Sequence, residues 1–502
     1  MTVPLKKNSV CEKIVRRKLA IFVFFLECIL LILFKAFGAY TSRADGSNIY
    51  NSIEPLFGGF NSRKFEEIFR IYSIFQDVHV MIFIGFGYLM VFLKKYGYSS
   101  VGFNFLVGAI TLQWSILCQG FFELTDDYKI EIGLMSLYRA DIATAVVLIS
   151  MGVVLGRTSY TQLIVMGILE IVAYSANNYL NSTIFKAVDV GGSVVVHSFG
   201  AYFGLAVSYM LGRSHNNSSC FKVENIRESS YTSDLLAMIG TIFLWLYWPS
   251  FNAIDLDTDK AYRAIINTYL SLTASCVTAF ITSQLTFTDH KFNMVYVQNA
   301  TLSGGVAIGA SANLMVEPFG AILIGFLAGA LSVFGYKIIS PFIEKHLSIE
   351  DTCGVHNLHG MPGLLGGIAA IIMASIASEK QYHKTLYEIY RARASPVVSE
   401  PTEYIHLEAG DGRTAGQQAG YQTILVLVTI VMSVFSGFLT GFIMNFKCWN
   451  QVTAESFYDD AVFWNLPKNE LEVENLKNYQ ITVTGKLYNS QNILRMSDVE
   501  RY

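Results

Sequence analysis

Long apolar runs alternate with short polar gaps along most of the chain. A helix that crosses the hydrocarbon core of a bilayer needs about 20 predominantly apolar residues. By this length the sequence predicts about twelve spans, and they lie near residues 18–40, 72–93, 101–122, 133–155, 160–180, 190–212, 234–254, 263–285, 293–315, 317–339, 352–378 and 419–446. The pattern predicts an all-α, polytopic membrane protein.

Three polar segments interrupt or flank these runs. Residues 1–17 form a polar amino terminus, 379–418 a long loop and 447–502 a tail. The loop and the tail lack the apolar periodicity that a large core of their own would need. We therefore expect one transmembrane channel domain over residues 18–446.

Basic residues in the short gaps predict the orientation of the chain. The amino terminus should be cytoplasmic because it carries Lys6, Lys7, Lys13, Arg16, Arg17 and Lys18. The even-numbered gaps then also lie inside, and they carry Lys94, Lys95, Arg157, Arg213, Lys291 and Lys337. Lys260 and Arg263 fall on the outer side and weaken the pattern slightly. An even number of spans returns the tail to the cytoplasm.

Composition agrees with a lipid environment. Hydrophobic residues make up 52% of the 502 residues and charged residues only 15%, and the mean hydropathy is +0.41. Soluble proteins carry nearer a quarter charged residues. A net charge of −3 gives no reason to expect a nucleic-acid partner. The seven cysteines show no metal-type spacing, so we expect neither a metal nor another cofactor.

A short motif occurs twice. The stretch Asp189–His197 recurs in outline as Asp351–His359. In both copies a glycine follows the aspartate by three residues, a histidine by eight and a further glycine by fifteen. The glycines are Gly192, Gly354, Gly204 and Gly366. The two histidines therefore occupy matching places.

The two copies open the fifth span of two five-helix blocks, residues 72–212 and 234–378. Because each block has an odd number of spans, the copies run in opposite directions across the membrane. A five-plus-five inverted repeat of this kind encloses a central site in many transporters. Each aspartate can cap the start of its helix, and each histidine lies about 12 Å deeper. We therefore expect His197 and His359 near the midplane.

Two interpretations of these histidines are open. Each ring could pack separately against a neighbouring helix, as buried histidines often do. Ionisable groups inside a membrane are costly and usually functional, and two of them at equivalent repeat positions favour a shared role.

Several motifs resemble one known family. They are Phe75–Phe83, His197–Gly204, Trp248–Asn252, Gln298–Leu302, Gly354–Gly363 and Asp459–Trp464. These stretches are similar to the signatures of the Rh glycoprotein branch of the ammonium transporter family. The resemblance extends from about residue 18 to about residue 467.

The resemblance implies a homotrimer in which each protomer has its own narrow, apolar pore. It implies twin histidines at the pore centre, matching His197 and His359, and acidic residues at helix starts, matching Asp189 and Asp351. Family members also gate the outer vestibule with two stacked phenylalanines, and Phe251 matches one of them.

The chain departs from the family at two vestibule positions. Ile142 stands where the second gate phenylalanine is usual, and Asn178 stands where the Rh branch usually has a glutamate. An aliphatic gate residue predicts a wider or less aromatic constriction, and the lost glutamate removes a charge that could attract ammonium. Both departures affect the expected gating of the pore and the recruitment of ammonium more than the conduction step itself.

The function implied is that of an ammonium/ammonia channel, which deprotonates ammonium at a vestibule and conducts neutral NH3 past the histidines. Three alternatives stay open: conduction of CO2 or another neutral gas, charge-coupled transport with a separate proton path, and a non-conducting sensor or scaffold that works through the tail. No nucleophile–base set stands out, so we expect no enzyme. The plasma membrane is the family default. Asn181 begins a sequon in an outer gap and is a candidate glycosylation site close to the membrane.

Overall fold

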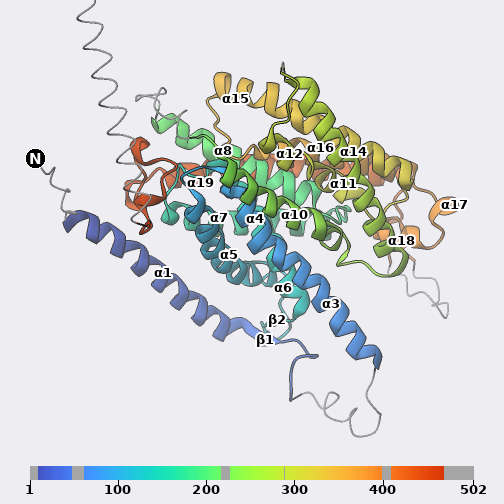
Figure 1. Cartoon of the computed structure of the whole chain (residues 1–502). Coiled ribbons are helices and arrows are strands. Elements are labelled where there is room, and N and C mark those ends of the chain that lie inside the picture. Colours follow the sequence, from blue (N-terminus) through green and yellow to red (C-terminus); the bar gives the residue numbers. More distant parts are fainter. Residues whose placement is uncertain (1–9, 48–61, 216–226, 288, 398–408, 468–502) are drawn as a thin grey trace, which may run out of the picture. The chain divides into compact units, whose positions relative to one another are not determined.

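The computed structural model describes residues 10–47, 62–215, 227–287, 289–397 and 409–467 (Figure 1). The chain divides into two compact units, Met1–Tyr458 and Asp459–Tyr502. The first unit contains the predicted membrane domain and is helical almost throughout. The described part of the second unit includes one short 3-10 turn, Asp460–Val462.

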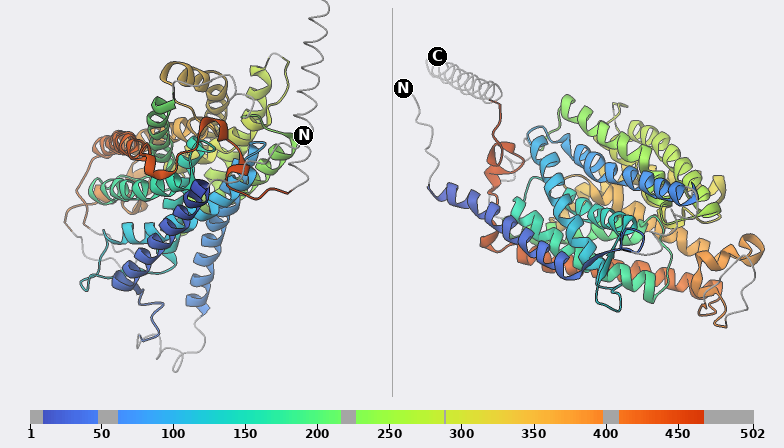
Figure 2. Two further views of the ribbon diagram at one scale, coloured as in Figure 1. Left: turned by 90° about the vertical axis from the view of Figure 1, so that its left-hand side faces the viewer. Right: turned by 90° about the horizontal axis from the view of Figure 1, so that it is seen from below.

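The first block of helices follows the predicted apolar runs. Its elements are α1 (Val10–Phe37), α3 (Ser62–Val80), α4 (Phe86–Leu89), α5 (Gly97–Gly120), α6 (Leu134–Val154), α7 (Tyr160–Tyr179) and α8 (Phe199–His215). The π-turn η1 (Met81–Gly85) joins α3 to α4, so that one continuous helical segment spans this region. α1 lies on the outside of the bundle, where Leu30 packs against Ile116 and Leu117 of α5 (Figures 1 and 2).

The second block repeats this arrangement. Its elements are α10 (Tyr231–Ala253), α11 (Thr258–Thr286), α12 (Met294–Ala300), α13 (Ser303–Ile308), α14 (Glu317–Phe334), α15 (Ser340–Leu347) and α16 (Met361–Ile376). The loop that follows carries the short helices α17 (Glu379–Tyr382) and α18 (Thr385–Ile389), and α19 (Ala415–Met444) is the last long helix. In the described part of the chain, the first block has five long spans after α1, and the second has four long spans together with the pair α12 and α13, an order that agrees with the predicted repeat.

A short parallel sheet ties the end of α1 to the bundle. Strand β1 (Gly38–Tyr40) pairs with β2 (Ile130–Ile132), and Gly38 lies opposite Ile130. Lys129 also donates a hydrogen bond from Nζ to the carbonyl of Ala36 at 2.6 Å. The segment that enters α6 is therefore fixed to the segment that leaves α1.

Eleven helices among the described residues are long and apolar enough to cross a membrane. They match eleven of the twelve predicted spans. The predicted run near 293–315 is instead broken between α12 and α13. The break accompanies very close packing: a Cβ on Gly305 would lie 2.7 Å from the indole of Trp248. An uninterrupted span is therefore replaced by two short helices that approach α10 closely.

Both histidine motifs begin with the same backbone device. Gly192 has a φ of +66° and Gly354 a φ of +69°, a left-handed conformation that glycine adopts without steric cost. A π-helical turn follows each motif glycine, η4 (Ser193–Ser198) and η8 (His356–Gly360). α8 and α16 continue from these turns. The glycine three residues after each aspartate is thus explained by the turn that it permits.

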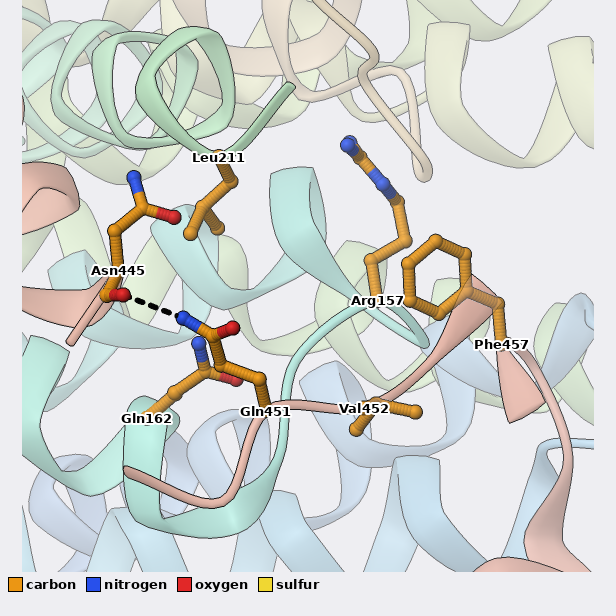
Figure 3. A pocket seen from close by; sticks show the side chains of 7 residues that line it. All are labelled: Arg157, Gln162, Leu211, Asn445, Gln451, Val452 and Phe457. Carbon is orange, nitrogen blue, oxygen red and sulfur yellow. Dashed lines mark hydrogen bonds between the residues drawn. The ribbon is translucent and has the colours of Figure 1, made fainter. Parts of the chain in front are cut away.

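The beginning of the predicted tail packs onto the helices. Ser159 donates to the carbonyl of Trp449 at 2.8 Å, and the amide of Tyr458 donates to the carbonyl of Gly156 at 2.9 Å. Figure 3 shows the small cavity at this end of α7 and α8, where Gln451 bonds the carbonyl of Asn445 at 2.7 Å. At about 10 Å³ the cavity holds at most one water molecule. The compact unit therefore extends past residue 447, the predicted start of the tail, to Tyr458.

Candidate functional site

The structure brings together the two histidines, which lie 162 residues apart in the sequence. The ring centroids of His197 and His359 are 5.1 Å apart with 20° between the planes. Their Nδ1 atoms are separated by 3.1 Å, so one ring donates and the other accepts. The exposed fractions are 1% and 4%. The two imidazoles share one hydrogen bond at this position, and no charged side chain bonds either ring among the described residues.

Aromatic rings enclose the pair on two sides. His197 lies 5.6 Å from the ring of Trp248 and 5.7 Å from that of Phe251. His359 stacks on Phe86 with centroids 6.3 Å apart. The Nε2 atom of His197 is enclosed and has no hydrogen-bond partner among the described residues. One imidazole nitrogen therefore remains available to a small molecule next to the pair.

A cavity of about 580 Å³ lies on one side of the pair; we call it the first cavity. Four predicted site residues line it, Asp189, Ile142, Phe251 and Asn178. The ring of Phe251 reaches from this cavity to His197. The first cavity therefore brings together Asp189 and the two predicted gate positions, Ile142 and Phe251, next to His197.

The first cavity also carries charged side chains that the sequence did not single out. Glu123 and Arg139 form an ion pair at 3.0 Å, with both side chains substantially exposed. Asp255 and Arg391 line the same cavity. Their polar surface is typical of a mouth that faces water rather than lipid.

Asp189 caps the turn that carries His197. Its Oδ2 atom accepts from the amides of Val194 at 2.9 Å and Val195 at 2.8 Å, while Oδ1 is enclosed without a partner among the described residues. Burial raises the pKa of this carboxyl to about 6, and the backbone hydrogen bonds oppose that rise. The carboxyl is thus half-ionised close to pH 6.

Tyr138 is a further aromatic residue next to the predicted gate positions, and the sequence analysis missed it. It lies one helical turn before Ile142 on α6, lines the same cavity, and donates from its hydroxyl to the carbonyl of Phe251 at 3.4 Å. An aromatic ring is therefore present beside Phe251 although Ile142 is aliphatic. The spacing of four residues on one helix face was the signal that could have identified it.

A second cavity of about 270 Å³ lies at the opposite end of the motif helices, and Asp351, Cys353 and His356 line it. A smaller cavity of about 20 Å³ is lined by Cys353 together with His359. Because Cys353 borders both and His359 lines the small cavity, the small cavity is a neighbour of the second cavity and of the histidine pair.

Asp351 repeats the capping role of Asp189 with a different geometry. Its Oδ1 accepts from the amide of Val355 at 2.9 Å and its Oδ2 from that of His356 at 2.8 Å. Burial raises the pKa of the Asp351 carboxyl, and the backbone N–H groups and Arg227 oppose the rise. Each carboxylate oxygen is occupied here, whereas Asp189 uses only one.

Arg227 closes one side of the second cavity. Its Nη2 donates to the backbone carbonyl of Asp351 at 3.0 Å, and its Nη1 pairs with Glu344 at 3.1 Å. Arg227 belongs to the link between α8 and α10. Its distance in sequence from both partners left no local signal by which it could be predicted.

The candidate glycosylation site at Asn181 is not supported. Asn181 is 1% exposed, and its Nδ2 atom donates to Asn177 at 2.9 Å and to Thr429 at 3.3 Å. A glycan is attached through this nitrogen on an accessible surface. The sequon therefore belongs to the packing between α7 and α19.

The part of the chain that matches a known family ends where the first compact unit ends, at residue 458. The sequence profile of the Ammonium Transporter Family matches residues 55–458. The protein named Ammonium transporter Rh type B of Danio rerio is 43% identical over 460 residues, which cover 91% of this chain and 94% of that protein. The protein of the same name from Xenopus tropicalis is 44% identical over 457 residues, with the same coverage.

Solved structures agree. Rh50 of Nitrosomonas europaea is 30% identical, with a TM-score of 0.65 over 83% of this chain and 98% of that one. Mep2 of Saccharomyces cerevisiae, at 16% identity and a TM-score of 0.59 over 78% of this chain and 91% of that one, shares the fold. These relatives form a class of transporters and not of enzymes. The chain belongs to the Ammonium Transporter Family, within its Rh branch.

Proposed function

We propose that the protein transports ammonium by conducting NH3 past His197 and His359. The observation that carries this proposal is the buried histidine pair, which adjoins the polar first cavity on one side and a small apolar cavity on the other and is bordered by aromatic rings. Moving a bare charge through such a section costs several kcal/mol even by lenient scales. A neutral passenger with hydrogen-bonding capacity fits the section better than an ion.

The first step takes place in the first cavity. Ammonium is attracted by Glu123, Asp255 and Asp189, and it transfers a proton to water, so that an N–H bond breaks and hydronium forms. The NH3 that remains passes Phe251 and exchanges its water contacts for hydrogen bonds to the imidazoles. The enclosed Nε2 atom of His197 offers such a bond, because a buried polar atom without a partner is otherwise costly.

We also propose that the first cavity faces outward. Acidic and basic side chains both line this cavity, so its side is inferred from the neighbouring short gaps. Arg227 lines the second cavity. The backbone amide of Lys94 donates to the carbonyl of the next residue, Glu228, at 3.1 Å. Basic residues favour the cytoplasmic side. The homotrimer and the plasma-membrane location stay predictions from the family.

The experiment is an ammonia-driven pH change in liposomes that contain the purified protein and an enclosed pH dye. The wild-type protein should accelerate internal alkalinisation, and the double variant His197→Leu/His359→Leu should return it to the rate of empty liposomes. His346→Leu is the matched control, because His346 is an exposed histidine on α15 outside the path. Equal rates for wild type and empty liposomes would contradict the proposal, and a current on a supported membrane would favour charge-coupled transport instead.

A further inference from the structure

A third imidazole lines the conduction path at the second cavity. His356 is the first residue of the turn η8, and its amide is held by Asp351 at 2.8 Å. Its ring lies edge-on to Tyr202 of α8, with centroids 5.9 Å apart and 79° between the planes. Gly360 leaves room for this ring, because a Cβ there would lie 3.2 Å from Cδ2 of His356. The backbone and its neighbours thus fix the ring at the edge of the cavity.

The first repeat has no equivalent imidazole. Val194 and His356 both follow the capping aspartate by five residues, and both donate their amides to it. The backbone positions therefore correspond, while one side chain is an inert aliphatic group and the other a titratable base. Since the first repeat forms the same capped turn with a valine, the turn itself does not require a histidine at position 356.

The ring of His356 is in contact with solvent space through the second cavity and also has an unsatisfied atom. Its Nδ1 atom is enclosed and has no hydrogen-bond partner among the described residues. A buried polar nitrogen of this kind is normally satisfied by a water molecule or a ligand. Ammonia, which both donates and accepts hydrogen bonds, matches this requirement.

We infer that His356 exchanges a proton with ammonia at the second cavity, an inference that rests on the proposed function. NH3 leaving the histidine pair takes a proton from the imidazolium of His356: the imidazolium N–H bond breaks, and the lone pair of NH3 forms the new bond. The neutral imidazole then takes a proton from water in the adjoining solution and leaves hydroxide. In the opposite direction, ammonium gives its proton to the neutral imidazole before NH3 enters the narrow section.

The groups that face His356 from the elements packed around it are compatible with this exchange. They are Asp351 and Cys353 on the preceding segment, Tyr202 on α8, Tyr336 on the turn before α15, Glu344 on α15 and Arg227 on the link to α10. The charge of Arg227 is balanced by Glu344. Both carboxylate oxygens of Asp351 accept from backbone amides, so this group caps the turn and does not pair with the ring of His356.

The test measures ammonia flux in membrane vesicles of defined sidedness while the pH is varied on one face at a time. In the wild type, flux should show a step where the imidazole of His356 gains its proton, as the pH is lowered on the second-cavity face. His356→Val should remove this step and reduce flux by roughly tenfold, less than positioned acid–base groups usually contribute, because water can partly replace it. The response to pH on the first-cavity face should not change.

Two further variants separate proton exchange from packing. His356→Gln keeps a polar side chain that cannot titrate, so it should lose the step as His356→Val does. Val195→His places an imidazole in the lining of the first cavity, next to the equivalent position Val194, and should create a step on the first-cavity face. These two variants also carry the test if His356→Val fails to fold, as judged by its elution from a sizing column.

The outcomes distinguish the two proposals. A wild type that does not conduct ammonia would overturn the proposed function. If the wild type conducts ammonia and His356→Gln responds to pH as the wild type does, only the role of His356 is overturned. The same holds if His356→Gln changes the pH response equally on both faces.

Discussion

The two ends of the proposed conduction path share a backbone arrangement and differ in their side chains. Each end has a capping aspartate, a left-handed glycine and a π-turn that presents a histidine. The first cavity is about twice as large, at about 580 Å³ against about 270 Å³. His356 and Arg227 line the second cavity, whereas the matching residue Val194 is buried outside the first cavity and no arginine bonds Asp189 among the described residues. The repeat thus preserves what positions the histidines and leaves the chemistry of each mouth free to diverge.

The largest expected effect concerns the two left-handed glycines. A Cβ on Gly354 would lie 2.2 Å from the ring of Tyr336, whose hydroxyl is held by the carbonyl of Cys353 at 2.9 Å. A Cβ on Gly192 would meet only Val196, at 2.5 Å. A left-handed alanine costs about 1–2 kcal/mol and an overpacked one about 1–3 kcal/mol more. Gly354→Ala should therefore lower the free energy of unfolding more than Gly192→Ala, by thermal denaturation in detergent.

Gly416→Ala is the control for these glycine variants. Gly416 lies in the first turn of α19, and nothing lies within 4 Å of a Cβ added there. This substitution should be neutral or slightly stabilising, by up to about 1 kcal/mol. Equal losses for Gly354→Ala and Gly192→Ala would show that the ring of Tyr336 moves freely, which would contradict the comparison.

The next effect concerns the two caps. Asp351 uses both carboxylate oxygens, and Asp189 uses Oδ2 alone. Asparagine retains one oxygen, so Asp189→Asn can keep both hydrogen bonds while Asp351→Asn must lose one. Loss of a helix cap costs about 0.5–2 kcal/mol, and we expect most of that loss for Asp351→Asn only. Melting temperatures of the two variants, measured in one detergent, decide the matter; the reverse order would refute the assigned geometry.

The pH dependence of stability offers a third test of the first cap. Burial raises the pKa of Asp189 from 3.8 to about 6. A carboxyl whose pKa is raised on folding stabilises the fold below its unfolded pKa, and that contribution is lost as the pH rises through the folded pKa. The melting temperature of the wild type should therefore fall relative to Asp189→Asn between about pH 4 and pH 6 and stay level above about pH 7. A difference that grows in the opposite direction would mean that the carboxylate is stabilised, not destabilised, by burial.

The sequence predicted those parts of the fold that depend on local pattern. Apolar run length gave the spans, and the repeated spacing of Asp189 and Asp351 placed His197 and His359 on equivalent helices. The same spacing could not predict Arg227, since its partner Glu344 is 117 residues away. Nor could it predict that Asn181 is enclosed, because a sequon carries no information on which helix face it occupies. Nor did apolar run length show the interruption between α12 and α13, because the residues next to it on both sides are apolar or small.

The smallest expected effect concerns the gate in the first cavity. Ile142 and Phe251 both line this cavity, and Tyr138 already provides a ring beside Phe251. Ile142→Phe should therefore narrow the entrance without creating its aromatic character, and it should lower ammonia flux by about two- to threefold, equivalent to roughly 0.5 kcal/mol in the barrier. Ile142→Leu, which keeps the volume, is the control and should conduct as the wild type does. Tyr138→Leu combined with Ile142→Phe should conduct better than Ile142→Phe alone if the two rings crowd each other. Equal flux in Ile142→Phe and the wild type would place the constriction at the histidine pair and not at the gate.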